Sequence, residues 1–304
     1  MVPTAKRELV HAQDQWSITQ FCAALTNALA GSGPALGIGN ILSTSVSTDV
    51  ALVVTTSGST GTPKEIHLSA AAVTASAKAA NTFLKADAGN SWSLLLPLTH
   101  IAGINVLVRA LLLKSEVLDF RNNSQYTKAD FTAIVPTQLN RALTADHQLL
   151  KHLQEAKAVL VGGAALTSEL HTQATNAGIT VVTTYGMSET SGGCVYNGVP
   201  LEGVQVAISD AGFIKVSGPV LASNLDFDAQ NWFVTSDRGE LVDGHLIVLG
   251  RGDDVIISGG ENISLIEIEN AISQTFSNFE FAAFAVLVGQ VAPFESAIPS
   301  IRAC

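Results

Sequence analysis

Apolar residues recur along the chain at two spacings, one typical of helices and one of strands. Where they recur every three or four positions, or run on for about ten residues, they predict helices. Gly31 and Ser69 stand at the expected stop and start of two of them. The predicted helices are 17–30, 69–86, Ile104–Leu113, a segment from Pro136 to about Leu153, and Ser168–Ala177, closed by Gly178.

Short apolar runs rich in β-branched residues alternate with these helices and predict strands. They are Val50–Thr55, Leu94–Leu96, Phe131–Val135, Ala158–Val161 and Ile179–Thr183. Strands that alternate with helices predict an α/β protein with a largely parallel sheet, in which ligands bind at the carboxyl ends of the strands. Three loops fit that position: 56–64, 162–164 and 184–190.

The pattern changes from about residue 200. Short β-rich runs separated by Asp-Gly-type turns are typical of antiparallel hairpins, so we expect a small β-subdomain there. The segment GRGDD (250–254) is a candidate hinge between domains. Beyond it, Leu265–Ile272 predicts a helix and Phe281–Val288 a strand.

Composition narrows the functional classes. The 304 residues are 47% hydrophobic and 14% charged, with a formal net charge of −10, which suits a globular protein and argues against a nucleic-acid partner. An anionic ligand would need local backbone NH groups, a lysine or a metal. Three scattered cysteines, no signal-peptide pattern and no uninterrupted membrane-length apolar run lead us to expect a soluble, cytoplasmic protein without a membrane partner.

The segment TTSGSTGTPK (55–64) follows the first of these strands and combines glycines, hydroxyl side chains and a lysine. It departs from the Walker A pattern, because Gly58 and Gly61 are too close and Glu65 follows Lys64. Glycines still let backbone NH groups approach anionic oxygens, and the lysine supplies a positive charge. On composition alone an ordinary surface loop stands as the alternative.

The segment closely resembles the phosphate loop of the adenylate-forming superfamily, which contains acyl-CoA synthetases, carrier-protein adenylation domains and luciferases. Further segments resemble that superfamily's motifs in the same order: LPLTHIAG (96–103), VGGAAL (161–166), TTYGMSET (183–190), FVTSDRGEL (233–241) and GRGDDVIISGGENISLIEIE (250–269). Within it, VPTQL (135–139) and YGMSETSGGCVYNGVPLEGV (185–204) resemble the o-succinylbenzoate–CoA ligases of menaquinone biosynthesis in actinobacteria.

The resemblance implies a fold and a reaction. We expect a large domain of α/β sheets with a small β-subdomain (1–252) and a shortened α+β carboxyl-terminal domain (253–304) after a hinge at Asp253. We expect ATP and Mg²⁺ to be used to adenylate an aromatic carboxylate, whose acyl group then passes to coenzyme A. The sequence leaves open whether the chain forms a homodimer.

Site residues follow from the motif positions. Lys64, His100, Ser188 and Glu189 are expected to be catalytic, with Glu189 the Mg²⁺ ligand. The nucleotide is expected to contact Thr56, Ser57, Gly58, Ser59, Thr60, Gly61, Thr62, Lys64, Gly162, Gly163, Ala164, Tyr185, Gly186, Met187, Ser188, Asp237 and Arg251. His100, Arg109, Gly186 and Gly192 are expected at the acyl substrate, and Gly259, Gly260, Glu261 and Asn262 to face coenzyme A.

Each role has a structural alternative. Tyr185 would stack on adenine, or be a half-buried core tyrosine; Asp237 would accept the ribose hydroxyls, or sit in a β-turn. His100 would line the acyl pocket or be structural. Arg109 and Arg141 are candidates for a second substrate carboxylate, or would face solvent or cap a helix.

The sequence departs from the superfamily at its end. The family's domain carries a late lysine that reaches the α-phosphate, whereas no lysine follows Lys215 here and only residues 254–304 follow the hinge. We therefore expect weakened adenylation with nucleotide binding retained. A ligase for another carboxylate and a non-catalytic nucleotide-binding remnant are alternatives. A NAD-dependent oxidoreductase is disfavoured, since GIGN (37–40) lacks a third glycine and a convincing preceding strand.

Overall fold

The computed structural model describes residues 6–13, 15–56, 64–123, 125–252, 255–258 and 261–264. It divides into two compact units, 1–249 and 250–304. The first unit contains three sheets and six α-helices among its described residues, so the predicted α/β class with a separate β-subdomain is confirmed.

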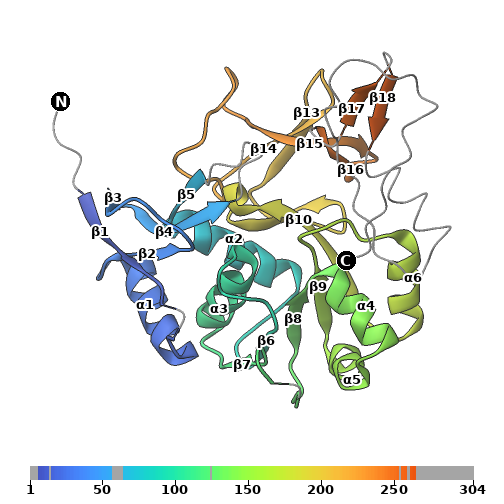
Figure 1. Ribbon diagram of the computed structural model, residues 1–304, viewed down its shortest axis with the longest axis horizontal. Coiled ribbons are helices and arrows are strands. Elements are labelled where there is room, and N and C mark those ends of the chain that lie inside the picture. Colours follow the sequence, from blue (N-terminus) through green and yellow to red (C-terminus); the bar gives the residue numbers. More distant parts are fainter. Residues whose placement is uncertain are drawn as a thin grey trace, which may run out of the picture. The chain divides into compact units, whose positions relative to one another are not determined.

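The first sheet has five strands in the order β3-β1-β2-β4-β5 (Figure 1). These strands are β1 (Lys6–His11), β2 (Ala35–Ile38), β3 (Ser45–Ser47), β4 (Val50–Thr56) and β5 (Lys64–Ser69). β1, β2 and β4 are parallel, while β5 is antiparallel to β4 and forms the outer edge. Its first residue, Lys64, pairs with Thr56 at the end of β4.

The second sheet has seven strands in the order β12-β11-β10-β9-β8-β6-β7. They are β6 (Trp92–Leu94), β7 (Val117–Asp119), β8 (Phe131–Ile134), β9 (Ala158–Val161), β10 (Val181–Met187), β11 (Gly192–Tyr196) and β12 (Val199–Pro200). β7, β6, β8, β9 and β10 are parallel, so their carboxyl ends meet at one edge. β11 and β12 continue the sheet in antiparallel pairs.

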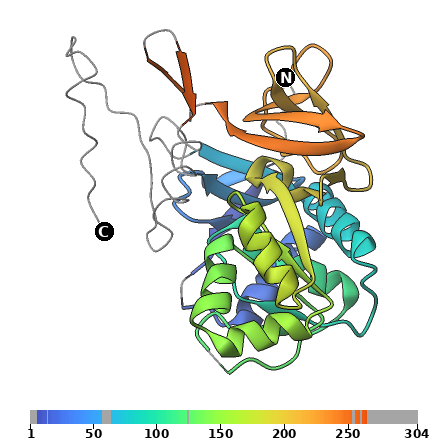
Figure 2. The same cartoon turned by 90° about the vertical axis from the view of Figure 1, so that its right-hand side faces the viewer.

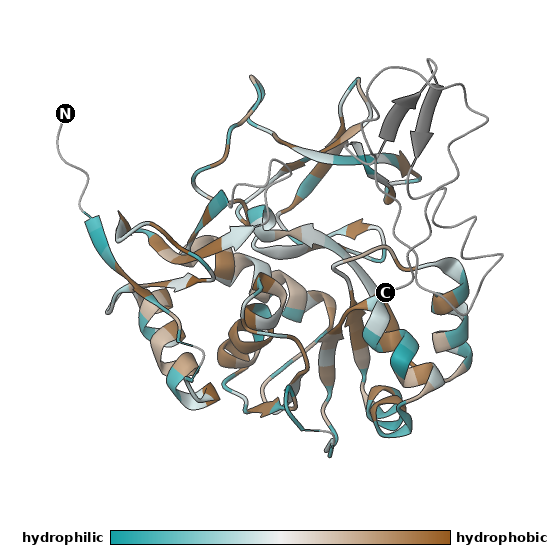
Figure 3. Ribbon diagram, in the orientation of Figure 1, coloured by the Kyte–Doolittle hydropathy of each residue, from teal (hydrophilic) through white to brown (hydrophobic). Residues whose placement is uncertain are grey.

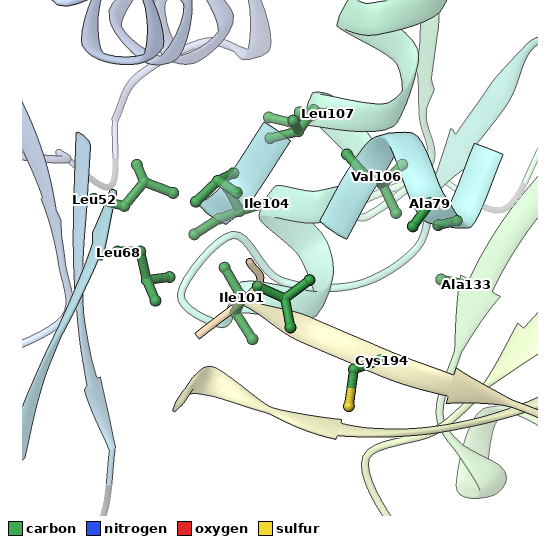
Figure 4. Close-up of a cluster of buried hydrophobic side chains, with 14 of the residues drawn as sticks. Leu52, Leu68, Ala79, Ile101, Ile104, Val106, Leu107, Ala133 and Cys194 are labelled. Carbon is green, nitrogen blue, oxygen red and sulfur yellow. The ribbon is translucent and has the colours of Figure 1, made fainter. Parts of the chain in front are cut away.

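A layer of helices separates these two sheets (Figure 1). It consists of α1 (Ile18–Ala30), α2 (Ala70–Phe83) and α3 (Ile101–Leu113), whose apolar residues join one core cluster with strands of both sheets. Figure 4 shows part of this core, where Leu52 and Leu68 of the first sheet face Ile101 and Ile104 of α3.

The opposite face of the seven-stranded sheet carries α4 (Pro136–Thr144), α5 (His147–Glu155) and α6 (Ser168–Asn176). Each is apolar toward the sheet and polar outward, as the mixed colouring of these helices shows in Figure 3. One long helix was predicted from Pro136 to Leu153, and that prediction is wrong. The chain breaks at Ala145–Asp146, where the Asp146 side chain accepts the Leu149 NH at 3.0 Å and starts a new helix.

The third sheet has the order β13-β14-β15-β16 and corresponds to the predicted β-subdomain (Figure 2). Its strands are β13 (Gln205–Ile208), β14 (Phe213–Ser217), β15 (Phe233–Val242) and β16 (His245–Arg251). In the second unit, β17 (Val255–Ser258) and β18 (Glu261–Ser264) form an antiparallel hairpin. The helix and strand predicted after residue 264 lie outside the described residues.

One other local prediction needs correction. Residues 184–187 are not a loop, because β10 continues to Met187 and a 3-10 helix, Ser188–Thr190, follows directly. GIGN overlaps a strand and does not follow one, because Gly37 and Ile38 are the last two residues of β2 (Ala35–Ile38), which lies between β1 and β4. The predicted capping of α1 by Gly31 and of α2 by Ser69 is confirmed.

Candidate active site

The carboxyl end of β10 holds the largest group of predicted site residues. Tyr185, Gly186 and Met187 are its last residues, and Ser188 and Glu189 form the 3-10 helix beyond it. The Thr190 hydroxyl fixes this turn: it accepts the Met187 NH at 2.9 Å and donates to the Gly192 carbonyl at 2.7 Å. The backbone around Ser188 and Glu189 is therefore held by the fully buried side chain of Thr190, which was not among the predicted site residues.

Tyr185 and Asp237 are 52 positions apart in sequence and are hydrogen bonded in the structure. The Tyr185 hydroxyl donates to Asp237 Oδ2 at 2.8 Å. Burial, together with the negative charge of Asp237, raises the pKa of Tyr185 far above its ordinary value, so the phenol stays a donor. The two residues expected at adenine and at ribose thus lie side by side.

Gly186 is required by the close approach of β11. A Cβ atom on Gly186 would lie 2.1 Å from the Gly192 carbonyl oxygen and 2.6 Å from Gly193 Cα. The register between the two strands shifts between Tyr185 and Gly186, which marks a bulge at this point. Gly186 and Gly192 are therefore brought together, as expected for residues of one site.

Gly162 and Gly163 follow β9, the strand next to β10. A Cβ on Gly162 would lie 2.1 Å from Thr184 Oγ1, and Gly163 has a φ of +83°, so both positions favour glycine. Gly163 and Ala164 are exposed. This strand end therefore lies directly beside β10, as the resemblance implies.

Glu189 is half-buried, and its carboxylate makes no hydrogen bond or ion pair with any residue that the structure describes. Only its backbone carbonyl is used, accepting the Ala222 NH at 2.9 Å. A carboxylate without a protein partner suits a divalent cation that keeps most of its waters. No group of three or more metal-ligating side chains occurs among the described residues, so Glu189 is the expected Mg²⁺ ligand on its own.

The phosphate loop is described only at its two ends. Thr56 closes β4 and exposed Lys64 opens β5, whereas Ser57, Gly58, Ser59, Thr60, Gly61 and Thr62 lie outside the described residues. Glu65 anchors the far side of the loop, because its carboxylate accepts hydrogen bonds from the Leu42 and Ser43 backbone NH groups and from the Ser43 hydroxyl. Burial alone would raise the pKa of Glu65, but these donors lower it.

The acyl-site candidates lie along α3. His100 is exposed and stands at the helix N-cap without a side-chain capping bond. Asn105, which sequence reasoning missed, is fully buried and donates to the Ser191 carbonyl at 2.8 Å, and a Cβ on Gly192 would lie 2.0 Å from its Nδ2. Gly192 therefore packs directly on the helix that carries His100.

Arg109 lies one turn beyond Asn105 and is only 4% exposed. Its guanidinium donates to the Tyr196 hydroxyl at 3.0 Å and stands 5.1 Å from the centre of the Trp92 ring. Its Nε has no hydrogen-bond partner, and no carboxylate of the described residues lies within ion-pair distance. A buried guanidinium without an anionic partner is costly.

Arg141 takes the helix-end alternative instead. It is about half exposed in the last turn of α4, and its Nε lies 3.6 Å from Asp146 Oδ2 at the start of α5. The contact of Arg141 with a substrate carboxylate stays a prediction. Arg251, Glu261 and Asn262 lie in the second unit, while Asp253, Gly259 and Gly260 fall outside the described residues.

A family model for AMP-binding enzymes matches residues 7–231. The chain belongs to the AMP-binding enzyme family. Among its relatives is a probable 2-succinylbenzoate–CoA ligase of Mycobacterium tuberculosis H37Rv, 40% identical over 82% of this chain and 73% of the relative. The 2-succinylbenzoate–CoA ligase of Haemophilus influenzae is 32% identical over 74% of this chain and 53% of the relative. The resemblance to this group of ligases is confirmed.

Solved structures agree with the family. Escherichia coli MenE with a bound analogue of OSB-AMS superimposes with a TM-score of 0.65, at 26% identity, over 86% of this chain and 65% of that one. The chain thus spans about three quarters of the mycobacterial relative, about half of the Haemophilus one and about two thirds of the E. coli structure. No helix of the described residues is both long enough and apolar enough to span a membrane.

Proposed function

We propose that this chain is an ATP-dependent, AMP-forming ligase that activates o-succinylbenzoate and transfers the acyl group to coenzyme A. The contact that carries the proposal is the hydrogen bond from Tyr185 to Asp237, which joins the aromatic ring expected at adenine to the carboxylate expected at ribose. The names of the relatives suggest 2-succinylbenzoate and coenzyme A as substrates, and ATP with a magnesium ion is bound in the similar Bacillus subtilis MenE structure.

In the first half-reaction a carboxylate oxygen of the substrate bonds to the α-phosphorus of ATP, and the bond to the β-phosphate breaks to release pyrophosphate. In the second, the thiol sulfur of coenzyme A bonds to the acyl carbon, and AMP leaves with the electron pair while the thiol proton passes to solvent. Both steps require alignment of anions and stabilisation of phosphate charge rather than covalent help from the protein.

The residues of β10 and its neighbours divide this work. Tyr185 stacks on adenine and orients Asp237 toward the ribose hydroxyls, and Ser188 supplies a hydroxyl donor to the α-phosphate. Lys64 places positive charge at the outer phosphates. Glu189 would hold Mg²⁺, which supplies further charge neutralisation when bound.

Arg109 receives the second carboxylate of o-succinylbenzoate in this proposal. Its burial, its free Nε and the lack of a carboxylate partner among the described residues support that role. The domain boundary after residue 252 also remains a proposal, supported by the division of the chain into units 1–249 and 250–304.

The decisive experiment measures pyrophosphate release with ATP, Mg²⁺ and o-succinylbenzoate. Glu189→Gln should lower the rate by about a hundredfold or more, as expected for loss of a group that stabilises developing charge. The matched control is Glu169→Gln on α6, an exposed residue whose carboxylate accepts a hydrogen bond from Gln173, and it should leave the rate unchanged. Equal rates in wild type and Glu189→Gln would contradict the metal assignment.

A ligase for another aromatic acid is the second candidate function. A variant of Arg109 can distinguish it from the first. With AMP present, o-succinylbenzoate should raise the unfolding temperature more than benzoate does, and Arg109→Met should remove the difference. Equal shifts from the two acids would favour the second candidate.

A further inference from the structure

The segment Val220–Asn224 connects β14 to the rest of the β-subdomain and touches two parts of the candidate site. The Ala222 NH donates to the Glu189 carbonyl at 2.9 Å. The Ser223 NH donates to the His67 carbonyl on β5 at 2.9 Å. Ser191, next to the 3-10 helix, donates its hydroxyl to the Val220 carbonyl at 2.7 Å.

The Asn224 side chain completes this connection. Its Oδ1 accepts the His67 backbone NH at 2.9 Å, and its Nδ2 donates to the Glu65 carbonyl at 2.8 Å. The amide therefore pairs with the outer edge of β5 as the backbone of another strand would. Both bonded groups lie within three residues of Lys64, the first residue of β5.

The two ends of this segment hold groups with complementary charge. One end fixes the strand that begins at the Lys64 ammonium, and the other fixes the backbone of Glu189, the expected Mg²⁺ ligand. β5 and the 3-10 helix are in contact. Because Asn224 helps to hold β5 in place, its hydrogen bonds can influence the distance between the Lys64 ammonium and the Glu189 carboxylate.

We infer that Asn224 is a positioning residue for the triphosphate–Mg²⁺ part of ATP, holding Lys64 and Glu189 in a fixed relation. The inference rests on the proposed function. Asn224 acts through β5 and through the backbone of Ala222 and Ser223, and it has no direct part in the chemistry. Adenosine binding at Tyr185 and Asp237 does not depend on it.

The test compares ATP with AMP, since only ATP carries the phosphates that need both charges. Asn224→Ala removes two hydrogen bonds at an exposed site. A hydrogen bond at such a site contributes a free energy at the lower end of the range usual for hydrogen bonds in proteins. We expect the dissociation constant of ATP·Mg²⁺, measured by calorimetry, to rise about tenfold. The dissociation constant of AMP should stay within about twofold, which a merely structural defect would not produce.

Two further variants sharpen the result. Gln154→Ala, the matched control, removes another exposed amide that donates to a backbone carbonyl at 2.7 Å, on the helical face of the other sheet, and should change neither constant. Asn224→Asp keeps the acceptor for His67 but turns an oxygen toward the Glu65 carbonyl, so it should weaken ATP·Mg²⁺ binding at least as much as Asn224→Ala.

Unchanged ATP·Mg²⁺ affinity in either Asn224 variant would overturn the inference while leaving the proposed function intact. Equal losses for AMP and ATP·Mg²⁺ would also overturn it, because they would indicate general disruption of the fold. A wild-type protein that binds neither nucleotide would overturn both the inference and the proposed function.

Discussion

Replacing Gly186 by alanine tests whether the contact between β10 and β11 sets the geometry of the site. The new Cβ would lie 2.1 Å from the Gly192 carbonyl oxygen, 2.6 Å from Gly193 Cα and 2.7 Å from the Gly192 carbonyl carbon. All three atoms belong to the backbone, so no side-chain rotation can relieve the clash. An ordinary contact begins at 3.4 Å, so the two strands must separate by more than an ångström.

The cost of that separation has two parts. Overpacking of this kind usually lowers the free energy of unfolding by about 1 to 3 kcal/mol. In addition, Tyr185 and Ser188 move with the strand, and a displacement of about 1 Å in a positioning group can cost on the order of a hundredfold in rate. We therefore expect Gly186→Ala to lower the rate of pyrophosphate release about a hundredfold.

The assay is pyrophosphate release at saturating ATP, together with thermal unfolding of the same preparation. Gly33→Ala is the matched control: Gly33 also has no positive φ, and its Cβ would meet only a side-chain atom, Asn27 Cβ, at 3.2 Å. The control should keep its rate. A Gly186→Ala protein with wild-type rate and unfolding temperature would refute the reasoning, because the strands would then have to tolerate the methyl group.

Three other measurements follow from single contacts. Tyr185→Phe keeps the ring but loses the bond to Asp237, so AMP affinity measured by calorimetry should fall by about three- to tenfold; no change would contradict the pairing. Burial lowers the pKa of His152, which lies 2.9 Å from the Ser93 hydroxyl, so below about pH 6.5 the unfolded chain binds a proton that the folded one does not. Denaturant unfolding should therefore show stability falling as the pH drops below about 6.5, and His152→Gln should lose that slope. Burial raises the pKa of Cys194 to about 12, so its thiol should react with maleimide only after unfolding, as peptide mass mapping would show.

Much of the fold was predictable because its elements carry strong local signals. Ala158–Val161 was predicted without error as a strand, and the caps at Gly31 and Ser69 have the expected geometry. The predicted ends of strands and helices were wrong where pairing with a distant strand overrides the local preference of the sequence. Tyr185 and Gly186 appear loop-like in sequence, yet pairing with β11 keeps them in a strand.

The site was predictable only where it follows motifs. Tyr185, Asp237 and Glu189 were identified through a resemblance to family motifs. Their positions relative to one another are known only from the folded structure. No sequence pattern indicated Asn105 or Asn224, because their side chains bond to backbone groups far away in sequence. The Asn224 amide, for example, donates to a carbonyl 159 positions away. Such contacts follow from how the sheets assemble, which no local pattern encodes.

The outer position of β5 has a consequence for the protein's behaviour in a crowded cell. An open strand edge is a template on which another polypeptide can pair, and proteins with such edges tend to aggregate. Here the outward NH and carbonyl of His67 and the carbonyl of Glu65 are already taken by Ser223 and Asn224. A short irregular segment thus blocks the pairing of a foreign strand at this edge, although the described residues form no sixth strand there.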